Sequence, residues 1–152
     1  MSGQVTGAEV LVRWQHPRDG LVAPGVFIPV AEESDLIVSL GEWVLAHACA
    51  LLAQPVFRAR RLRLSVNLSA RQFRQAGFVG QLRAVLAATG ADPRLLTLEV
   101  TEGLVIDDFD DAVAKMRALA ALGVDMSLDD FGTGYSSPVS YTHLTLPTTP
   151  YV

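Results

Sequence analysis

Apolar and polar residues follow two different periods along this chain. Short apolar runs predict four strands, and longer segments with helical periodicity predict helices between them. Because strands and helices alternate at these spacings, we predict an α/β protein with crossover connections and a parallel sheet. The predicted strands span residues 7–14, 62–69, 95–102 and 124–131, and the predicted helices span about 35–54, 78–88 and 108–123.

The predicted helices carry residues that favour helix ends. Ser34 or Asp35 can cap the first helix, and Asp107 or Asp108 can cap the third, because their side chains accept hydrogen bonds from free backbone N–H groups. A glycine follows each of the second and third helices, where a left-handed residue ends a helix at little cost. These signals fix the helix ends more closely than periodicity does.

The two faces of the predicted strands differ in polarity, because successive side chains of a strand point to opposite sides. One face is apolar and is predicted to pack against the helices. A buried parallel strand is usually apolar on both faces, so a second, polar face indicates a polar interior. A barrel of parallel strands with its chemistry at the strand ends provides such an interior. The polar face carries Glu9, Leu11, Arg13, Arg63, Ser65, Asn67, Thr97, Glu99, Thr101, Asp125, Ser127 and Asp129.

Four oxygen-bearing side chains of that face form the candidate site. Asn67, Glu99 and Asp129 lie toward the C-terminal ends of their strands, whereas Glu9 lies earlier in its strand. Carboxylate and amide oxygens without His or Cys suit hard ions such as Mg²⁺ or Mn²⁺. The adjacent pair Asp129–Asp130 could bridge two ions, as two-metal phosphodiester chemistry requires.

Some of these motifs have simpler interpretations when taken alone. The sequence from Glu99 to Glu102 also fits an ordinary polar strand end. The two glycines after Asp130 predict a tight turn in a loop that folds over the site, and the segment lacks the lysine of a phosphate-binding loop. His16 is a weak candidate ligand, and His47 is interpreted as a histidine of the core.

Composition narrows the range of functions. The net charge of -4 and the pI of about 5.2 argue against binding to a nucleic acid polymer, which needs a basic face. Cys49 is the only cysteine, so we expect a buried thiol, no internal disulfide and a reducing cytoplasmic environment. Neither a signal peptide nor an apolar run long enough for a membrane span is found in the sequence.

Five motifs in order resemble a known family. AEVLVRWQHP, PGVFIPVAEE, SVNLSARQF, LEVTE and DDFGTGYSS look like the EAL family, the cyclic di-GMP phosphodiesterases of bacteria. The founding Glu-Ala-Leu appears here as Glu9-Val10-Leu11. The resemblance covers residues 5–137, and it implies a TIM-type (β/α) barrel, here a partial one, that holds two Mg²⁺ or Mn²⁺ ions.

The resemblance also implies roles for particular residues. Glu9, Asp129, Asp130 and Glu102 would be catalytic, with Glu102 anchoring the DFGTG loop. Leu11 and Arg13 would bind the substrate, the arginine through a phosphate. A metal-activated water would open cyclic di-GMP to linear pGpG, and a homodimer of the intact domain is expected. The metal ligands would be Glu9, Asn67, Glu99, Asp129 and Asp130.

The sequence departs from the family pattern after residue 137. The family continues with a Lys-Ile-Asp strand, a later catalytic Glu and a Gln, whereas the only lysine here is Lys115 in the third helix. A complete barrel takes about 250 residues. We therefore predict a partial EAL domain at 1–137 and a non-family tail at 138–152, disordered or of non-native origin.

Three functions remain open from the sequence. The first is a phosphodiesterase of which this polypeptide is a piece. We predict that the piece as written does not hydrolyse cyclic di-GMP. The second is a sensor that binds the dinucleotide without cutting it. The third is an interaction module, or simply a polar-lined α/β fragment without a ligand.

Overall fold

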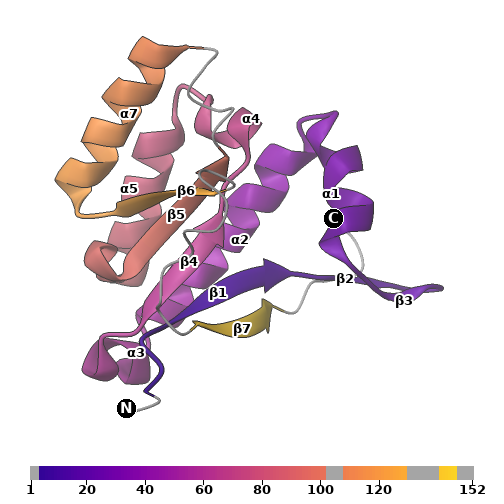
Figure 1. Ribbon diagram of the computed structural model, residues 1–152, viewed down its shortest axis with the longest axis horizontal. Helices are drawn as coiled ribbons and strands as arrows, with labels where there is room; N and C mark the ends of the chain where they lie inside the picture. Colours follow the sequence, from indigo (N-terminus) through magenta and orange to yellow (C-terminus); the bar gives the residue numbers. More distant parts are fainter. Residues whose placement is uncertain (1–3, 102–107, 130–140, 147–152) are drawn as a thin grey trace.

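The four predicted strands all form and lie side by side in parallel. The computed structural model describes residues 4–101, 108–129 and 141–146 (Figure 1). The strands are slightly shorter than predicted, and the first ends at Val12 instead of Trp14 because the chain there enters a separate hairpin. Their bounds are β1 Gly7–Val12, β4 Arg63–Asn67, β5 Leu96–Thr101 and β6 Asp125–Asp129.

A fifth strand that the pattern did not predict completes the sheet. β7 (Tyr141–Leu146) pairs in parallel with the free edge of β1, with Gly7 opposite Tyr141 and Val12 opposite Leu146. The strand order of the sheet is therefore β6-β5-β4-β1-β7. β7 lies within the segment interpreted as a non-family tail, so part of that segment has regular structure. The domain boundary at residue 137 and the origin of the tail stay predictions.

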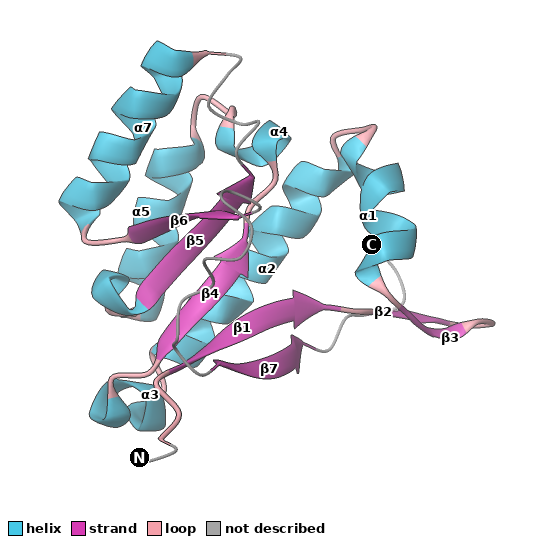
Figure 2. Cartoon of the chain, in the orientation of Figure 1, coloured by secondary structure: helices cyan, strands magenta, loops and turns pink. Residues whose placement is uncertain are grey.

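Three long helices cover one face of the sheet. α2 (Leu36–Leu52), α5 (Phe78–Thr89) and α7 (Phe109–Leu122) match the three predicted helices. α2 packs on β4, α5 lies between α2 and α7, and α7 packs on β6 (Figure 2). Parallel strands with helices on one face are the arrangement of a partial (β/α) barrel.

The remaining elements are short. The hairpin strands extend beyond the sheet, and α1 follows them within the PGVFIPVAEE segment (Figure 1). These elements are β2 Trp14–His16, β3 Gly20–Val22, α1 Pro24–Glu32, α3 Pro55–Arg60, α4 Ala70–Phe73 and the 3₁₀ turn η1 Pro93–Leu95.

The helix ends form as their sequence signals predict. The Asp108 carboxylate accepts a hydrogen bond from the Asp111 backbone N–H at 3.1 Å, and Ser34 Oγ accepts from the Leu36 N–H at 3.3 Å. Gly123 ends α7 with φ at 97°. Arg61, which follows α3, is left-handed with φ at 51°. A side chain in that conformation costs roughly 1–2 kcal/mol relative to glycine.

The apolar strand face and the helices form one core. Leu64, Leu96 and Leu98 are fully buried on the helix-facing side of their strands, as alternation predicts. They belong to one cluster with side chains of all three long helices. This packing orients the opposite face of the same strands, because the two faces cannot be exchanged without turning the core outward.

Cys49 lies fully inside this core on α2. Burial raises the pKa of its thiol from 9.0 to about 11. We expect iodoacetamide to leave Cys49 unmodified at pH 8 in the folded protein and to label it in urea, because the thiolate is the reacting form. The thiol also couples folding to pH: its stabilising contribution is complete below about pH 9 and is lost as the pH rises toward 11. Mass spectrometry of the labelled protein measures the first effect, and rapid labelling without urea would contradict it.

Candidate functional site

The polar strand face forms successive rows across the sheet. In the first row, Glu9 lies opposite Ser65, Ser65 opposite Thr97, and Thr97 opposite Asp125. The next row toward the C-terminal strand ends holds Asn67, Glu99 and Ser127. Side chains two residues apart on a strand share a face, so these rows form one polar surface.

Glu9 and Asn67 are in direct contact, although Glu9 lies one row deeper. The Asn67 side-chain Nδ2 donates a hydrogen bond to Glu9 Oε1 at 3.2 Å. Asn67 pairs in register with Glu99 on the neighbouring strand, and the Leu68 backbone N–H donates to the Glu99 carbonyl at 2.8 Å. The early position of Glu9 in its strand therefore does not separate it from Asn67.

Two residues of the polar face are buried at the centre of the sheet. Ser65 is 1% exposed and Thr97 is 7% exposed, although both lie on the side of the sheet away from the helices. The Ser65 Oγ is buried and has no hydrogen-bond partner within the described part of the chain. A buried hydroxyl without a partner is costly. The polar face is therefore buried at its centre, at Ser65 and Thr97, whereas Arg63, Asn67, Asp125 and Ser127 around them are exposed.

Several predicted site residues fall outside what the structure describes. Asp130 and Glu102 lie outside the described residues, and Asp129 is described only in its backbone, opposite Thr101 at the C-terminal edge. Among the side chains in the described ranges, no three His, Cys, Asp or Glu groups lie close enough to hold a metal ion. The described donors are the oxygens of Glu9, Asn67 and Glu99, which are the ligand types of a hard divalent ion. Their chemistry therefore fits Mg²⁺ or Mn²⁺.

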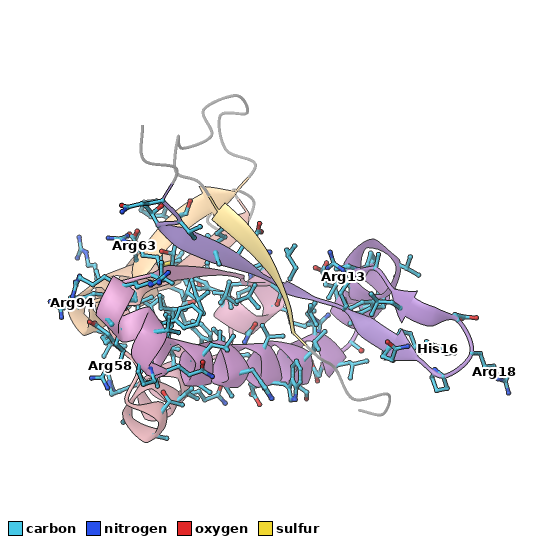
Figure 3. All side chains as sticks on the ribbon, turned by 90° about the horizontal axis from the view of Figure 1, so that it is seen from below. Arg13, His16, Arg18, Arg58, Arg63 and Arg94 are labelled. Atoms are coloured by element: carbon cyan, nitrogen blue, oxygen red, sulfur yellow. The ribbon has the colours of Figure 1, made fainter. Side chains whose placement is uncertain are left out.

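A cavity of about 510 Å³ opens at the same strand ends. Asn67 and Glu99 share its wall with Leu11 and with apolar side chains of α1 and α2. Arg13 lies just beyond the end of β1, and its Nη1 donates to the Val12 carbonyl at 2.9 Å (Figure 3). The two predicted substrate-binding residues are thus near the strand end, and their roles stay predictions.

Two residues of the cavity wall were missed by the sequence analysis. Ser69 Oγ caps α4 by accepting from the Gln72 N–H at 3.1 Å, and the spacing Ser-x-x-Gln is a capping-box signal that could have found it. The Gln72 side chain does not return to the cap. It is 3% exposed, lies against Gly41 of α2, and its Nε2 has no partner in the described part of the chain.

The two histidines considered as weak candidates have local roles. His16 Nδ1 accepts from the backbone N–H groups of Arg18 and Asp19, both at 3.1 Å, and so shapes the turn of the hairpin. His47 is exposed and its Nδ1 lies 2.8 Å from the Trp43 carbonyl, so its interpretation as a core histidine was wrong. Helical periodicity alone did not distinguish the edge of the apolar stripe from its centre.

Lys115 is held in the helical layer. Its Nζ donates to the Phe73 carbonyl at 2.8 Å and pairs with Asp111 at 2.9 Å, and its side chain is 9% exposed. The sequence contains no other lysine. The polar strand face therefore has no lysine available from residues 1–152.

The sequence matches one family and several longer proteins. The EAL domain model matches residues 1–147. The chain is 44% identical over 145 residues to the bifunctional diguanylate cyclase/cyclic di-GMP phosphodiesterase MucR of Pseudomonas aeruginosa, covering 90% of this chain and 20% of MucR. It is 47% identical over 135 residues to an uncharacterized signaling protein of Caulobacter vibrioides, covering 89% and 16%. The chain thus spans about a fifth of the length of these relatives.

Solved structures share the fold. The PaMucR phosphodiesterase in complex with c-di-GMP superposes with a TM-score of 0.81 at 43% identity, covering 91% of this chain and 59% of that one. The EAL enzyme Bd1971, bound to cAMP and cyclic-di-GMP, superposes with a TM-score of 0.79 at 32% identity, covering 89% and 38%. Within the described ranges, no helix has the length and apolar character needed to cross a membrane.

Proposed function

The chain belongs to the EAL domain family, and from this premise we propose that it carries part of the active site of a cyclic di-GMP phosphodiesterase. The observation that supports the proposal most directly is the contact between Glu9 and Asn67 beside Glu99, at the C-terminal ends of parallel strands. Active sites of (β/α) barrels form at that end. The relatives of known structure include c-di-GMP complexes.

The residues of the proposed site would have different roles in metal binding. Glu9, Asn67, Glu99 and Asp129 would hold the first divalent ion, and Asp129 with Asp130 the second. The Asn67 amide, which donates to Glu9, would hold that carboxylate in a fixed orientation and leave its own oxygen for the ion. Mg²⁺ or Mn²⁺, when bound, supplies charge neutralisation and an activated water for phosphodiester hydrolysis.

Substrate binding would use the same strand end. Arg13 would hold a phosphate of cyclic di-GMP, since a planar guanidinium matches phosphate oxygens, and Leu11 would contact the ligand from the cavity wall. Glu102 would anchor the loop that follows Asp129. We also propose that the protein acts in the cytoplasm, where this signalling nucleotide is found. The intact domain is proposed to self-associate.

The chain of 152 residues is expected to bind cyclic di-GMP with help from Mn²⁺ and to form no linear pGpG. Turnover is not expected because the only lysine is fixed to the Phe73 carbonyl on the helical side of the sheet. Isothermal titration with and without Mn²⁺ measures binding, and chromatography of the nucleotides measures hydrolysis.

The outcomes separate the candidate functions. Dinucleotide binding that Mn²⁺ strengthens supports the phosphodiesterase site. Equal binding of the dinucleotide with and without Mn²⁺ would favour a sensor. Binding of neither the dinucleotide nor Mn²⁺ would indicate a fragment without a ligand. Clear production of pGpG would contradict the expected lack of turnover.

A further inference from the structure

A second recess lies at the opposite end of the strands from the candidate site. It has a volume of about 430 Å³ and is formed where the polypeptide enters β4, β5 and β6. Figure 3 shows Arg63 and Arg94 at this end of the molecule, and Arg13 and Arg18 at the other. The recess is lined by Arg61, Arg63, Arg94, Leu95, Gly123 and Asp125.

The recess concentrates positive charge on a chain whose net charge is -4. Three arginines from two segments line it, and Asp125 is the one carboxylate in its lining, with Asp92 paired to Arg94 beside it. Asp125 lies 3.5 Å from Arg63, and both side chains remain more than half exposed. Arg58 and Arg60, in the last turn of α3, add two further cations at this end. Positive charge therefore exceeds negative charge around the recess.

Arg94 is paired with a carboxylate, and Arg61 has an unusual backbone conformation. Asp92 accepts hydrogen bonds from Arg94 Nε and Nη2, each at 3.1 Å, and these bonds lower the pKa of the Asp92 carboxyl. A Cβ on Gly123 would lie 3.3 Å from Arg94 Cγ, so the glycine lets the arginine lie close to the backbone. Arg61 occupies a left-handed position that glycine would fill at lower cost.

The shape and charge of the recess select one class of ligand. Guanidinium groups bind phosphate oxygens in pairs, and three of them around one hollow match an anion with several linked phosphates. The volume lies in the range of small-molecule sites, whereas a membrane or a nucleic acid polymer would need a broader basic face. We propose that the recess lined by Arg61, Arg63 and Arg94 binds a polyphosphate anion, either free or as the phosphate chain of a nucleotide.

Isothermal titration of the full chain tests this site independently of the divalent-metal site. The probes are tripolyphosphate, ATP and orthophosphate, with EDTA present so that no divalent ion contributes. Tripolyphosphate is expected to bind with a Kd below about 1 mM at low ionic strength. Orthophosphate is expected to bind at least about tenfold more weakly, because it reaches fewer guanidinium groups.

Three variants have different expected results. Arg94→Gln and Arg61→Gly are each expected to weaken tripolyphosphate binding about tenfold. Arg61→Gly removes the cation while fitting the left-handed backbone, so the fold is retained. Asp125→Asn is expected to strengthen binding severalfold, because it removes the carboxylate that competes for Arg63. Arg18→Gln, which removes one positive charge from the hairpin at the far end, is the matched control and should leave the affinity unchanged (Figure 3).

The remaining outcomes decide the proposal. Equal affinity for ATP and tripolyphosphate supports recognition of the phosphate chain alone, and tighter ATP binding supports a nucleotide. Equal weakening by Arg18→Gln and Arg94→Gln would show only general charge attraction and would overturn the site. Tighter binding of a hexaglutamate peptide than of tripolyphosphate would overturn it in favour of an acidic protein segment.

Discussion

Replacing Glu99 with glutamine is expected to weaken Mn²⁺ binding by about 10- to 100-fold while leaving the fold intact. The substitution keeps the shape of the side chain and removes the negative charge that a hard cation prefers. The backbone carbonyl of Glu99 still accepts from the Leu68 N–H, so the strand pairing is unchanged. Isothermal titration with Mn²⁺ measures the affinity, and circular dichroism measures the fold.

Glu42→Gln is the matched control for this prediction. Glu42 is exposed on α2 and does not line the cavity at the strand ends. The Glu42→Gln substitution removes the same charge from the protein without changing the polar strand face. If both variants bind Mn²⁺ as the unchanged chain does, Glu99 is not a ligand, and the proposed metal site loses one of its two described carboxylates.

Replacing Lys115 with alanine is expected to lower the free energy of unfolding by about 2–4 kcal/mol. The ammonium group donates to the Phe73 carbonyl at 2.8 Å, lies 2.9 Å from Asp111 and sits 5.5 Å from the centre of the Phe73 ring. Its loss leaves the last carbonyl of α4 without its charged donor and removes the buried stem that joins α7 to α4. Urea unfolding followed by circular dichroism measures the change.

Two further variants separate charge from packing at this position. Lys115→Met keeps an apolar stem of similar length, so it should lose less stability than Lys115→Ala. Arg117→Ala, on an exposed position of the same helix, should change stability by no more than about 0.5 kcal/mol. If Lys115→Ala were as mild as Arg117→Ala, the hydrogen bond to Phe73 would not contribute measurably.

Periodicity and helix-end residues predict most of this fold because they report local preferences. The alternation in residues 62–69 and 95–102 placed Leu64 and Leu98 in the core and Asn67 and Glu99 on the other face, and the structure confirms both. Asp108 was named as one of two candidate caps, and it is the cap that forms. These features depend on neighbours a few residues away.

Features that depend on distant contacts were not predicted. Nothing local shows that Gln72 lies against Gly41, that Lys115 reaches Phe73, or that residues 141–146 pair with β1. The contact between Glu9 and Asn67 was also outside the reach of the strand pattern, which correctly placed Glu9 one row deeper but could not show that the two side chains meet. Each of these contacts depends on the relative position of two elements. That position follows from packing and not from the hydrophobic periodicity of the sequence.

The pairing of β7 with β1 has a consequence for the order of folding. Gly7 lies opposite Tyr141, so two segments about 130 residues apart in the sequence must meet before the outermost edge of the sheet forms. Closing so large a loop carries an entropic cost that the neighbouring pairs β1–β4, β4–β5 and β5–β6 do not share to the same extent. The sheet is therefore expected to assemble through its central strands first, with the last strand docking in a late and separable kinetic phase.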